Sequence, residues 1–402
     1  MTTPLAPRGA TIEPFHAGEI GLLAMARLRA GLPAIAMHFG QPSAGIATKA
    51  RAAAHASLDR DSSGYWLSAA LKERIARHYG ETHGVEVAPE RVLLTGGASA
   101  GLTAVFVALF AAGDRIGLAR PGYPAYRNAL KALGRTAVEI DCGADVQYRL
   151  RPSVLDALVE PLHGLIVASP ANPTGAMLSK EELGALVERC RRDGTRLISD
   201  EIYHGVSYGM EATTALALDP DAIVLNSFSK LFRMPGWRLG WIIAPNNCVR
   251  TLNDYLINLF LVPSSLSQHA ALAAFDDMPE LIETVAQYAH NRDRLLAELP
   301  RMGLRGIAPP DGAFYLYADV GHLTDDSLAF CRRIVDETGV AIAPGIDFDP
   351  IRSTATVMCA SRLRSPARRS SGRSRCSARG WRGSRASADR GRAVAQAASC
   401  WR

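Results

Sequence analysis

Short apolar runs alternate with amphipathic segments between about Arg91 and Pro245. One intervening segment, residues 179–192, opens with Ser179 and Glu182 at the spacing of a helix capping box. Its apolar positions then recur every three or four residues, as on one face of a helix. The strand-like runs are RVLLT (91–95), DRIGLA (114–119), TAVEI (136–140), GLIVAS (164–169), TRLIS (195–199), AIVLN (222–226) and LGWIIA (239–244). This alternation predicts an α/β fold with a mostly parallel seven-stranded sheet and helices on both faces.

A second region begins at "PPDGAFYLYADV" (309–320), which has a strand pattern and is followed by the helical segment 325–339. A chain of 402 residues is also long for a single core. We therefore expect a large domain at 41–277 and a smaller α/β domain at 278–352. Residues 1–40 are expected to pack with the smaller domain.

The basic charge of the chain is concentrated in its last fifty residues. The segment 353–402 holds 12 arginines and one acidic residue, which leaves 33 basic and 38 acidic residues in the rest of the chain. The basic balance therefore gives no indication of a nucleic-acid-binding face on the folded part. The segment is rich in Arg and Ser, shows neither helical nor strand periodicity, and is predicted to be disordered.

Composition and cysteine spacing indicate the cellular compartment in which the protein is expected. The hydrophobic share is 48%, and the longest apolar run, residues 104–112, is too short to span a bilayer. No basic and apolar leader pattern precedes residue 20. The seven cysteines show no paired or metal-binding spacing, which favours a reducing compartment. We predict a cytoplasmic protein with no membrane, nucleic-acid or metal partner.

The loops after the predicted strands carry unusual side chains. "GGASAG" (96–101) opens a helix after the first strand, where bare backbone N–H groups attract anions. "RPGYPAY" holds Tyr123 between two prolines, and "PANPTG" presents Asn172. Each stretch taken alone is equally typical of an ordinary turn or a loop aromatic residue.

Later strand ends add charged groups. "DEIYHG" places Asp200 at a strand end with Tyr203 three residues on, although an aspartate there is also a common helix N-cap. "NSFSKLFRMPGWRLGW" then brings Ser227, Lys230 and Arg238. A lysine beside apolar residues is costly to desolvate unless it is paired, shifted in pKa or covalently occupied.

The strand ends together match what a phosphorylated pyridine aldehyde requires. Such a cofactor needs a lysine for a Schiff base and a carboxylate for its ring nitrogen. It also needs a phosphate cradle with serine and arginine donors, and a ring to stack on. The combination predicts that Lys230 holds pyridoxal 5'-phosphate.

The same stretches resemble the class I/II aminotransferases, pyridoxal-phosphate enzymes of fold type I in the aspartate aminotransferase superfamily. The resemblance covers about residues 39–351. It rests on "YW…LKERIARHYG" (from residue 65), "TGGAS", "RPGYPAY", "SPANPTG", "SDEIYHG", "NSFSKLFRMPGWRLGW" and "GAFY". It implies an enzyme that moves an amino group between an L-amino acid and a 2-oxo acid in a ping-pong cycle.

The resemblance also implies roles for individual residues. Lys230 is the Schiff-base lysine and general base, Asp200 pairs with the ring nitrogen, and Tyr203 bonds the ring oxygen. The other implied cofactor contacts are Asn172 at the ring oxygen, Tyr123 on the ring face, and Ala98, Ser99, Ser227 and Arg238 at the phosphate. In a homodimer, Tyr65 would reach the phosphate of the partner subunit. Gly40 and Asn172 are the implied substrate contacts.

The chain departs from the family beyond Arg352. The family continues with a strand whose arginine binds the substrate carboxylate, and its loss would cost about 2–5 kcal/mol of binding. Back-translation of residues 353–364 in a frame one base away gives HRYGDVRLSFA, which has the expected pattern, so a frameshift is one explanation. A natural arginine-rich tail is the other.

Three alternatives to an active aminotransferase stay open at this level. A β-eliminating C–S lyase of the same fold would use the same residues. A non-catalytic binding protein or regulator would retain the fold alone. The altered end of the chain also allows an inactive product of an aminotransferase gene.

Overall fold

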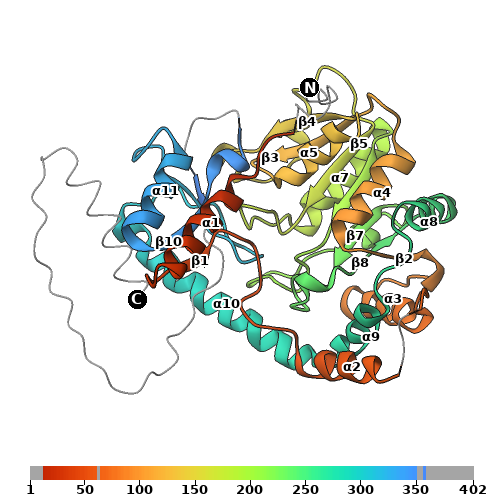
Figure 1. Ribbon diagram of the computed structural model, residues 1–402. Helices are drawn as coiled ribbons and strands as arrows, with labels where there is room; N and C mark the ends of the chain where they lie inside the picture. Colours follow the sequence, from red (N-terminus) through yellow and green to blue (C-terminus); the bar gives the residue numbers. More distant parts are fainter. Residues whose placement is uncertain (1–11, 61–63, 351–355, 359–402) are drawn as a thin grey trace, which may run out of the picture. The chain divides into compact units, whose positions relative to one another are not determined.

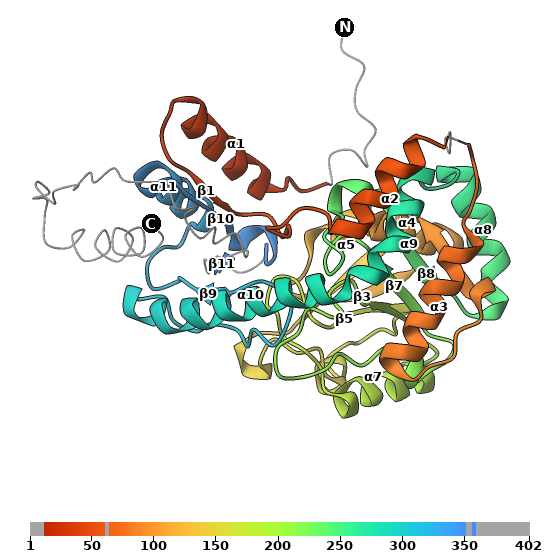
Figure 2. The same ribbon diagram turned by 90° about the horizontal axis from the view of Figure 1, so that it is seen from below.

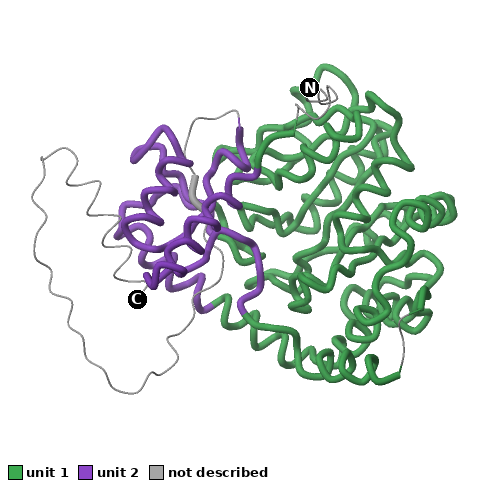
Figure 3. The backbone as a smooth tube through the Cα atoms, viewed as in Figure 1, with its two compact units in different colours: residues 1–14, 44–289, 308–315 green, residues 15–43, 290–307, 316–402 purple. Residues whose placement is uncertain are grey.

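The computed structural model describes residues 12–60, 64–350 and 356–358, which fall into two compact units (Figure 3). Unit 1 comprises the chain up to Pro14, Ala44–Ala289 and Ala308–Tyr315. Unit 2 comprises Phe15–Ser43, His290–Ile307 and the chain from Leu316 onward. The domains expected from the sequence divide after residues 40, 277 and 352 instead, so the two divisions assign residues 12–14, 41–43, 278–289 and 308–315 differently.

Unit 1 is built on a seven-stranded sheet with the order β2-β8-β7-β6-β5-β3-β4 (Figure 1). Strand β8 is antiparallel to both β2 and β7, and every other neighbouring pair is parallel. The strands are β2 (Val92–Thr95), β3 (Arg115–Arg120), β4 (Thr136–Asp141), β5 (Gly164–Ala168), β6 (Arg196–Asp200), β7 (Ile223–Ser227) and β8 (Gly240–Ile243). All seven predicted strands form, and the predicted α/β fold with a mostly parallel sheet is confirmed.

Helices cover both faces of this sheet. Side chains of α4, α5 and α8 share one hydrophobic core with alternate residues of the strands, whereas α7 lies on the opposite side (Figure 2). The helices of unit 1 are α2 (Thr48–Leu58), α3 (Ala69–His83), α4 (Ala98–Leu109), α5 (Pro124–Ala132), α6 (Pro152–Leu155), α7 (Lys180–Asp193), α8 (Asn246–Phe260) and α9 (Ser265–Ala274), while α10 (Met278–Glu298) begins here and ends in unit 2.

The capping box predicted for α7 is present. The Ser179 hydroxyl accepts a hydrogen bond from the Glu182 backbone N–H at 3.2 Å. The Glu182 carboxylate in turn accepts one from the Ser179 N–H at 3.0 Å. The two bonds satisfy backbone donors that the first helical turn leaves without partners.

Parallel pairing gathers the predicted site at one edge of the sheet. Strands β3, β5, β6 and β7 run in the same direction, so the loops at their carboxyl ends emerge together. The register pairs Ala168 with Asp200 and Asp200 with Leu225. The residues that follow these three strand ends therefore lie along a common line.

Unit 2 has a four-stranded sheet with the order β1-β10-β11-β9. Its elements are α1 (His16–Arg29), β1 (Ile35–Met37), β9 (Tyr317–Asp319), α11 (Ser327–Thr338), β10 (Val340–Pro344) and β11 (Thr356–Met358). The N-terminal strand β1 pairs in parallel with β10, and residues of α1 and α11 share a core with both strands.

Strand β11 corrects one prediction. No strand was expected from residue 353 onward, yet Thr356–Met358 pairs antiparallel with β10 and with β9. Backbone hydrogen bonds to two flanking edges specify so short a strand, and three residues are too few for side-chain alternation to reveal it. The rest of the predicted disordered tail, residues 359–402, lies outside the described residues.

Two further features concern the described residues only. The cysteines at 142, 190, 248 and 331 are free thiols and are buried. None of the described helices combines the length and apolar character that crossing a bilayer requires.

Candidate active site

Lys230 lies three residues beyond the end of β7, with its side-chain nitrogen among aromatic rings. Its Nζ is 5.3 Å from the centre of the Tyr203 ring and 5.7 Å from that of Phe314. Burial lowers the pKa of the Lys230 amine to about 8, with Asp200 opposing the shift and Arg238 adding to it. An amine with this pKa is a far better nucleophile and base near neutral pH than a surface lysine.

Asp200 ends β6 and is 4% exposed. One carboxylate oxygen accepts the Tyr126 hydroxyl, and the other accepts the Ile202 backbone N–H at 3.1 Å. Burial raises the pKa of Asp200, while the bonds from Tyr126 and Ile202 and the charge of Lys230 act in the opposite direction. The hydrogen bonds fix the orientation of a carboxylate that would otherwise be costly to bury.

Tyr203 shares a hydrogen bond with a second phenol, that of Tyr315. Both rings are buried, and burial raises the pKa of both hydroxyls, so both are neutral. The rings meet edge to face with centroids 5.5 Å apart.

Tyr123 precedes α5 and packs edge to face on Tyr126, with ring centroids 5.4 Å apart. Burial and the charge of Asp200 raise the pKa of Tyr123, and Arg238 lowers it. The same two charges shift the pKa of Lys230, so one local electrostatic field acts on the phenol and the amine.

The turn between β2 and α4 is where the phosphate cradle was predicted. Gly97 has φ +88° and caps α4 without a side chain, so the first N–H groups of the helix, at Ala98 and Ser99, have no capping partner from it. The exposed Arg238 side chain reaches this turn, where its Nη2 donates to Gly96 O at 3.4 Å. Helix N–H groups and a guanidinium are therefore brought to the same place, an arrangement that suits an anion.

Ser227, the last residue of β7, is held firmly. Its hydroxyl donates to Leu239 O at 3.1 Å and is 2.7 Å from the Ser229 hydroxyl. Ser229 is 6% exposed, and its backbone N–H donates to Ser227 Oγ at 3.1 Å. The predicted Ser227 thus has a hydrogen-bonded neighbour, Ser229, from the same stretch of sequence.

Asn172 presents a free polar atom. Its buried Oδ1 has no hydrogen-bond partner among the described residues. A buried amide without a partner is uncommon, and its two ends exchange by a flip of the side chain, so either an acceptor or an N–H donor can face a ligand. The loop is closed by bonds from Ala171 N to Ala176 O and from Gly175 N to Ala171 O.

Two further residues predicted for the site are Tyr65 and Gly40. Tyr65 is 83% exposed in the single chain. Gly40 belongs to unit 2, where it follows the bend after β1. Their suggested roles therefore stay predictions.

The structure adds Tyr126 and Tyr315 to the predicted residues. Both belong to stretches that had been singled out, "RPGYPAY" and "GAFY", but nothing in the sequence shows which phenol faces Asp200 or Tyr203. Their partners lie 74 and 112 residues away along the chain.

These residues fit pyridoxal phosphate. A buried amine with a lowered pKa, a fixed carboxylate, an amide with an unpartnered atom and a helix N-terminus beside an arginine suit the aldehyde, ring nitrogen, ring oxygen and phosphate of that cofactor. No group of three or more His, Cys, Asp or Glu side chains in the described ranges is arranged to hold a metal ion.

Known proteins agree with this chemistry. The family model for aminotransferase class I and II matches residues 34–360, a range that extends beyond the predicted one at both ends. The chain is 44% identical over 364 residues to a valine–pyruvate aminotransferase of Mycobacterium tuberculosis, covering 89% of this chain and 94% of that protein.

Solved structures of aminotransferases are also similar to this chain. An aminotransferase from Mycobacterium tuberculosis superposes with a TM-score of 0.88 and 40% identity, covering 100% of this chain and 99% of the other. A putative aminotransferase from Silicibacter pomeroyi gives 0.85 and 40%, with 99% of each chain covered. These names favour amino-group transfer over the alternative of an eliminating lyase. The chain belongs to the class I and II aminotransferases, and it is a pyridoxal-phosphate-dependent enzyme that transfers amino groups.

Proposed function

We propose that the amine of Lys230 is the catalytic base of this aminotransferase. The observation that carries the proposal is a buried lysine, with a pKa lowered to about 8, beside Asp200 and the Tyr203 ring. The other residues proposed to hold the cofactor are Asp200, Tyr203, Asn172 and Tyr123 around the ring, and Ala98, Ser99, Ser227 and Arg238 around the phosphate.

Pyridoxal phosphate supplies an aldehyde that bonds to amines and a protonated ring that withdraws electrons from the substrate Cα. Lys230 Nζ would take up the proton of the substrate Cα and deliver it to the former aldehyde carbon of the cofactor. The low pKa suits this work, because the amine must be neutral to accept a proton near neutral pH.

Asp200 and Tyr203 would act on two different atoms of the cofactor ring. Asp200, held by Tyr126 and Ile202, keeps the ring nitrogen protonated through its negative charge. Tyr203 and Asn172 donate hydrogen bonds to the ring oxygen. Tyr123 packs on the ring face, and Tyr126 supports it from the side.

The substrate proposal is a small apolar L-amino acid as donor and a small 2-oxo acid such as pyruvate as acceptor. It rests on the 44% identity to an enzyme named valine–pyruvate aminotransferase. Gly40 is proposed to close over the substrate carboxylate. An arginine for that carboxylate was predicted to be missing from the segment after Arg352, which lies largely outside the described residues.

We further propose a cytoplasmic homodimer in which Tyr65 reaches the phosphate of the partner's site. The support is the 83% exposure of Tyr65 in the single chain, together with the resemblance of the "YW" stretch at 65–66 to the family.

An absorbance titration tests the catalytic proposal. Purified protein is mixed with pyridoxal phosphate, and then with valine, alanine and aspartate in separate samples. We expect a visible band that the Lys230→Ala variant lacks, and bleaching of this band by valine or alanine at lower concentration than by aspartate.

The other outcomes are equally informative. A band that no amino acid bleaches would contradict amino transfer and indicate that substrate binding is lost. A band that persists in Lys230→Ala would contradict the assignment of the lysine. In a further sample with a cysteine thioether, release of thiol, ammonia and 2-oxo acid with no bleaching would favour the lyase alternative.

A further inference from the structure

The segment 308–315, here called the strap, belongs to unit 1, although the chain on both sides of it belongs to unit 2. It contains the "GAFY" stretch, residues 312–315, and ends in Tyr315. Phe314 and Tyr315 are 6% and 2% exposed. The proposed function uses neither of them directly.

Backbone hydrogen bonds attach the strap to two loops of the site. Gly312 N donates to Gly175 O at 2.9 Å, in the loop that carries Asn172. Ala313 N donates to Val206 O at 2.8 Å, three residues beyond Tyr203. The Tyr208 hydroxyl donates to Ala313 O at 2.5 Å. The strap is therefore fixed to the loops that follow both β5 and β6.

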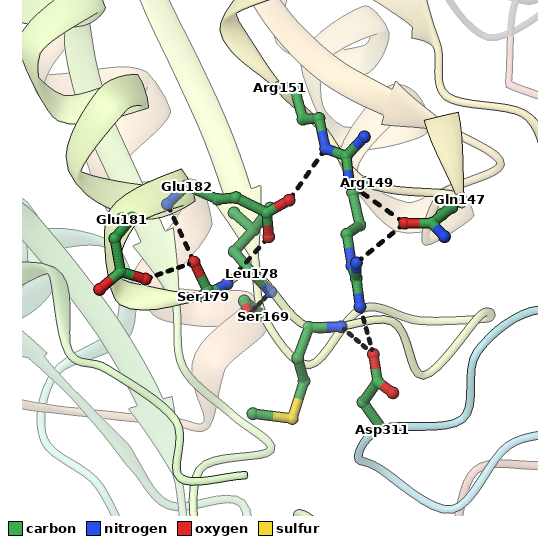
Figure 4. Close-up of polar contacts among 10 residues, drawn as sticks. Gln147, Arg149, Arg151, Ser169, Leu178, Ser179, Glu181, Glu182 and Asp311 are labelled. Atoms are coloured by element: carbon green, nitrogen blue, oxygen red, sulfur yellow. Dashed lines mark hydrogen bonds and ion pairs between the residues drawn. The ribbon is translucent and has the colours of Figure 1, made fainter. Parts of the chain in front are cut away.

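The carboxylate of Asp311 adds a further attachment. Its Oδ2 accepts the Met177 backbone N–H at 3.2 Å and Arg149 Nη2 at 3.1 Å (Figure 4). Both partners belong to unit 1: Arg149 lies in the segment before α6, and Met177 lies in the segment before α7. One carboxylate thus joins the strap to the far end of the Asn172 loop.

The strap packs so closely against the loop that carries Asn172 that a side chain would not fit at Gly312 or Gly175. A Cβ on Gly312 would lie 2.4 Å from Pro170 Cγ, and a Cβ on Gly175 would lie 2.8 Å from Gly312 O. The strap backbone is therefore closely packed against the Asn172 loop just before Tyr315.

The geometry points to Tyr315 as a positioning residue that orients the Tyr203 hydroxyl through their hydrogen bond, with Asp311 fixing the strap that carries it. The inference rests on the proposed function. The ring oxygen of the cofactor accepts hydrogen bonds, so Tyr203 donates its single hydroxyl proton to it. Tyr203 can then only accept from Tyr315, which strengthens Tyr203 as a donor.

This arrangement has a spectroscopic consequence. A hydrogen bond to the ring oxygen draws negative charge away from it, so the lysine-derived nitrogen nearby holds its proton less tightly. Weakening the donor therefore raises the pH midpoint at which the visible band of the lysine-bound cofactor titrates. Tyr203→Phe is expected to raise it most, and Tyr315→Phe by about half a pH unit or more.

The test is a pH titration of that band in the holoenzyme and its variants, with the melting temperature recorded for each. The double variant Tyr203→Phe/Tyr315→Phe is expected to match Tyr203→Phe alone, since Tyr315 acts through Tyr203. Tyr315→His, which keeps a ring N–H donor, is expected to stay closer to the unmodified chain than Tyr315→Phe. If Tyr315→Phe does not fold, Tyr315→His and Asp311→Asn carry the comparison.

Tyr79→Phe is the matched control, because Tyr79 is a buried tyrosine whose hydroxyl lies 3.5 Å from Glu201 Oε2, outside the proposed site. We expect no shift of the midpoint there. An unshifted midpoint in Tyr315→Phe, or a shift that adds in full to that of Tyr203→Phe, would overturn the role of Tyr315.

Asp311→Asn tests the attachment of the strap separately. It is expected to raise the pH midpoint, but by less than Tyr315→Phe does. A shift in Tyr315→Phe without one in Asp311→Asn would overturn only the role of Asp311. Failure of the proposed function looks different, because the unmodified chain would then show no lysine-bound band.

Discussion

At the scale of single residues, burial controls the charge of Lys230 in the cofactor-free chain. A lysine pKa of about 8 means that the neutral, nucleophilic amine appears as the pH rises through 8, well below the 10.5 of an ordinary lysine. Asp200 raises this pKa because its negative charge stabilises the ammonium form. Removing that charge therefore lowers the pKa further.

The rate of cofactor uptake tests this charge assignment. We expect the rate at which the cofactor-free chain bonds pyridoxal phosphate, trapped by borohydride, to rise with pH to a midpoint near 8. In Asp200→Asn the midpoint moves to lower pH. A midpoint near that of an ordinary surface lysine in both proteins would contradict the burial of the amine.

Tyr126 is the residue on which the orientation of Asp200 depends. Its hydroxyl bonds the Asp200 carboxylate and lowers the pKa of that group, and its ring supports Tyr123. Tyr126→Phe keeps the ring packing and removes only the hydrogen bond. The carboxylate pKa then rises, so the acid limb of the activity profile should move to higher pH.

A charge-assisted hydrogen bond contributes about 1.5–3 kcal/mol, so we expect kcat of Tyr126→Phe to fall by about tenfold or more. The measurement is kcat and KM against pH. Tyr79→Phe, the same change at another buried tyrosine, is expected to leave the profile in place. Equal losses in both variants would point to general destabilisation instead.

At the scale of elements, the β2–α4 turn requires glycine for two reasons. Gly97 has φ +88°, which disfavours any side chain, and a Cβ there would lie 2.4 Å from Arg238 Nη2. An added methyl group would therefore displace the guanidinium from the cradle as well as strain the backbone.

A substitution at Gly113 separates the backbone strain from the displacement of Arg238. It has φ +87°, and a Cβ added there would meet no atom within 4 Å, so Gly113→Ala carries the strain alone. We expect both alanine variants to lose about 1–2 kcal/mol in the free energy of unfolding. Only Gly97→Ala should bind pyridoxal phosphate more weakly, as measured by equilibrium titration. Unchanged affinity in Gly97→Ala would argue against Arg238 as a phosphate ligand.

At the scale of the whole molecule, the proposed dimer makes a prediction about shared sites. Chains carrying Lys230→Ala and chains carrying Tyr65→Ala are co-expressed with different tags, and the hybrid is purified. If Tyr65 serves the partner's site, one site of the hybrid holds both defects and the other holds none.

We expect the hybrid to recover about half of the unmodified activity, above either parent variant. A hybrid that is no more active than its parents would assign Tyr65 to its own subunit. A monomer in sedimentation experiments would exclude the shared site altogether.

The sequence by itself determined the local elements and the chemistry at their ends. The alternation of strand and helix patterns specified all seven strands of the large sheet, because apolar periodicity reflects local burial. It also placed Asp200 at the end of its strand and Lys230 just beyond the end of another, and parallel strands bring their carboxyl ends to one edge.

Only the tertiary structure decided which side chains meet across that edge. Tyr126 and Asp200 are 74 residues apart, and Tyr203 and Tyr315 are 112 apart, so no local pattern encodes either pair. The same holds for β11, whose three residues become a strand because β9 and β10 offer hydrogen-bonding edges on both sides. Local propensity selects an element, whereas strand order and packing select its partners.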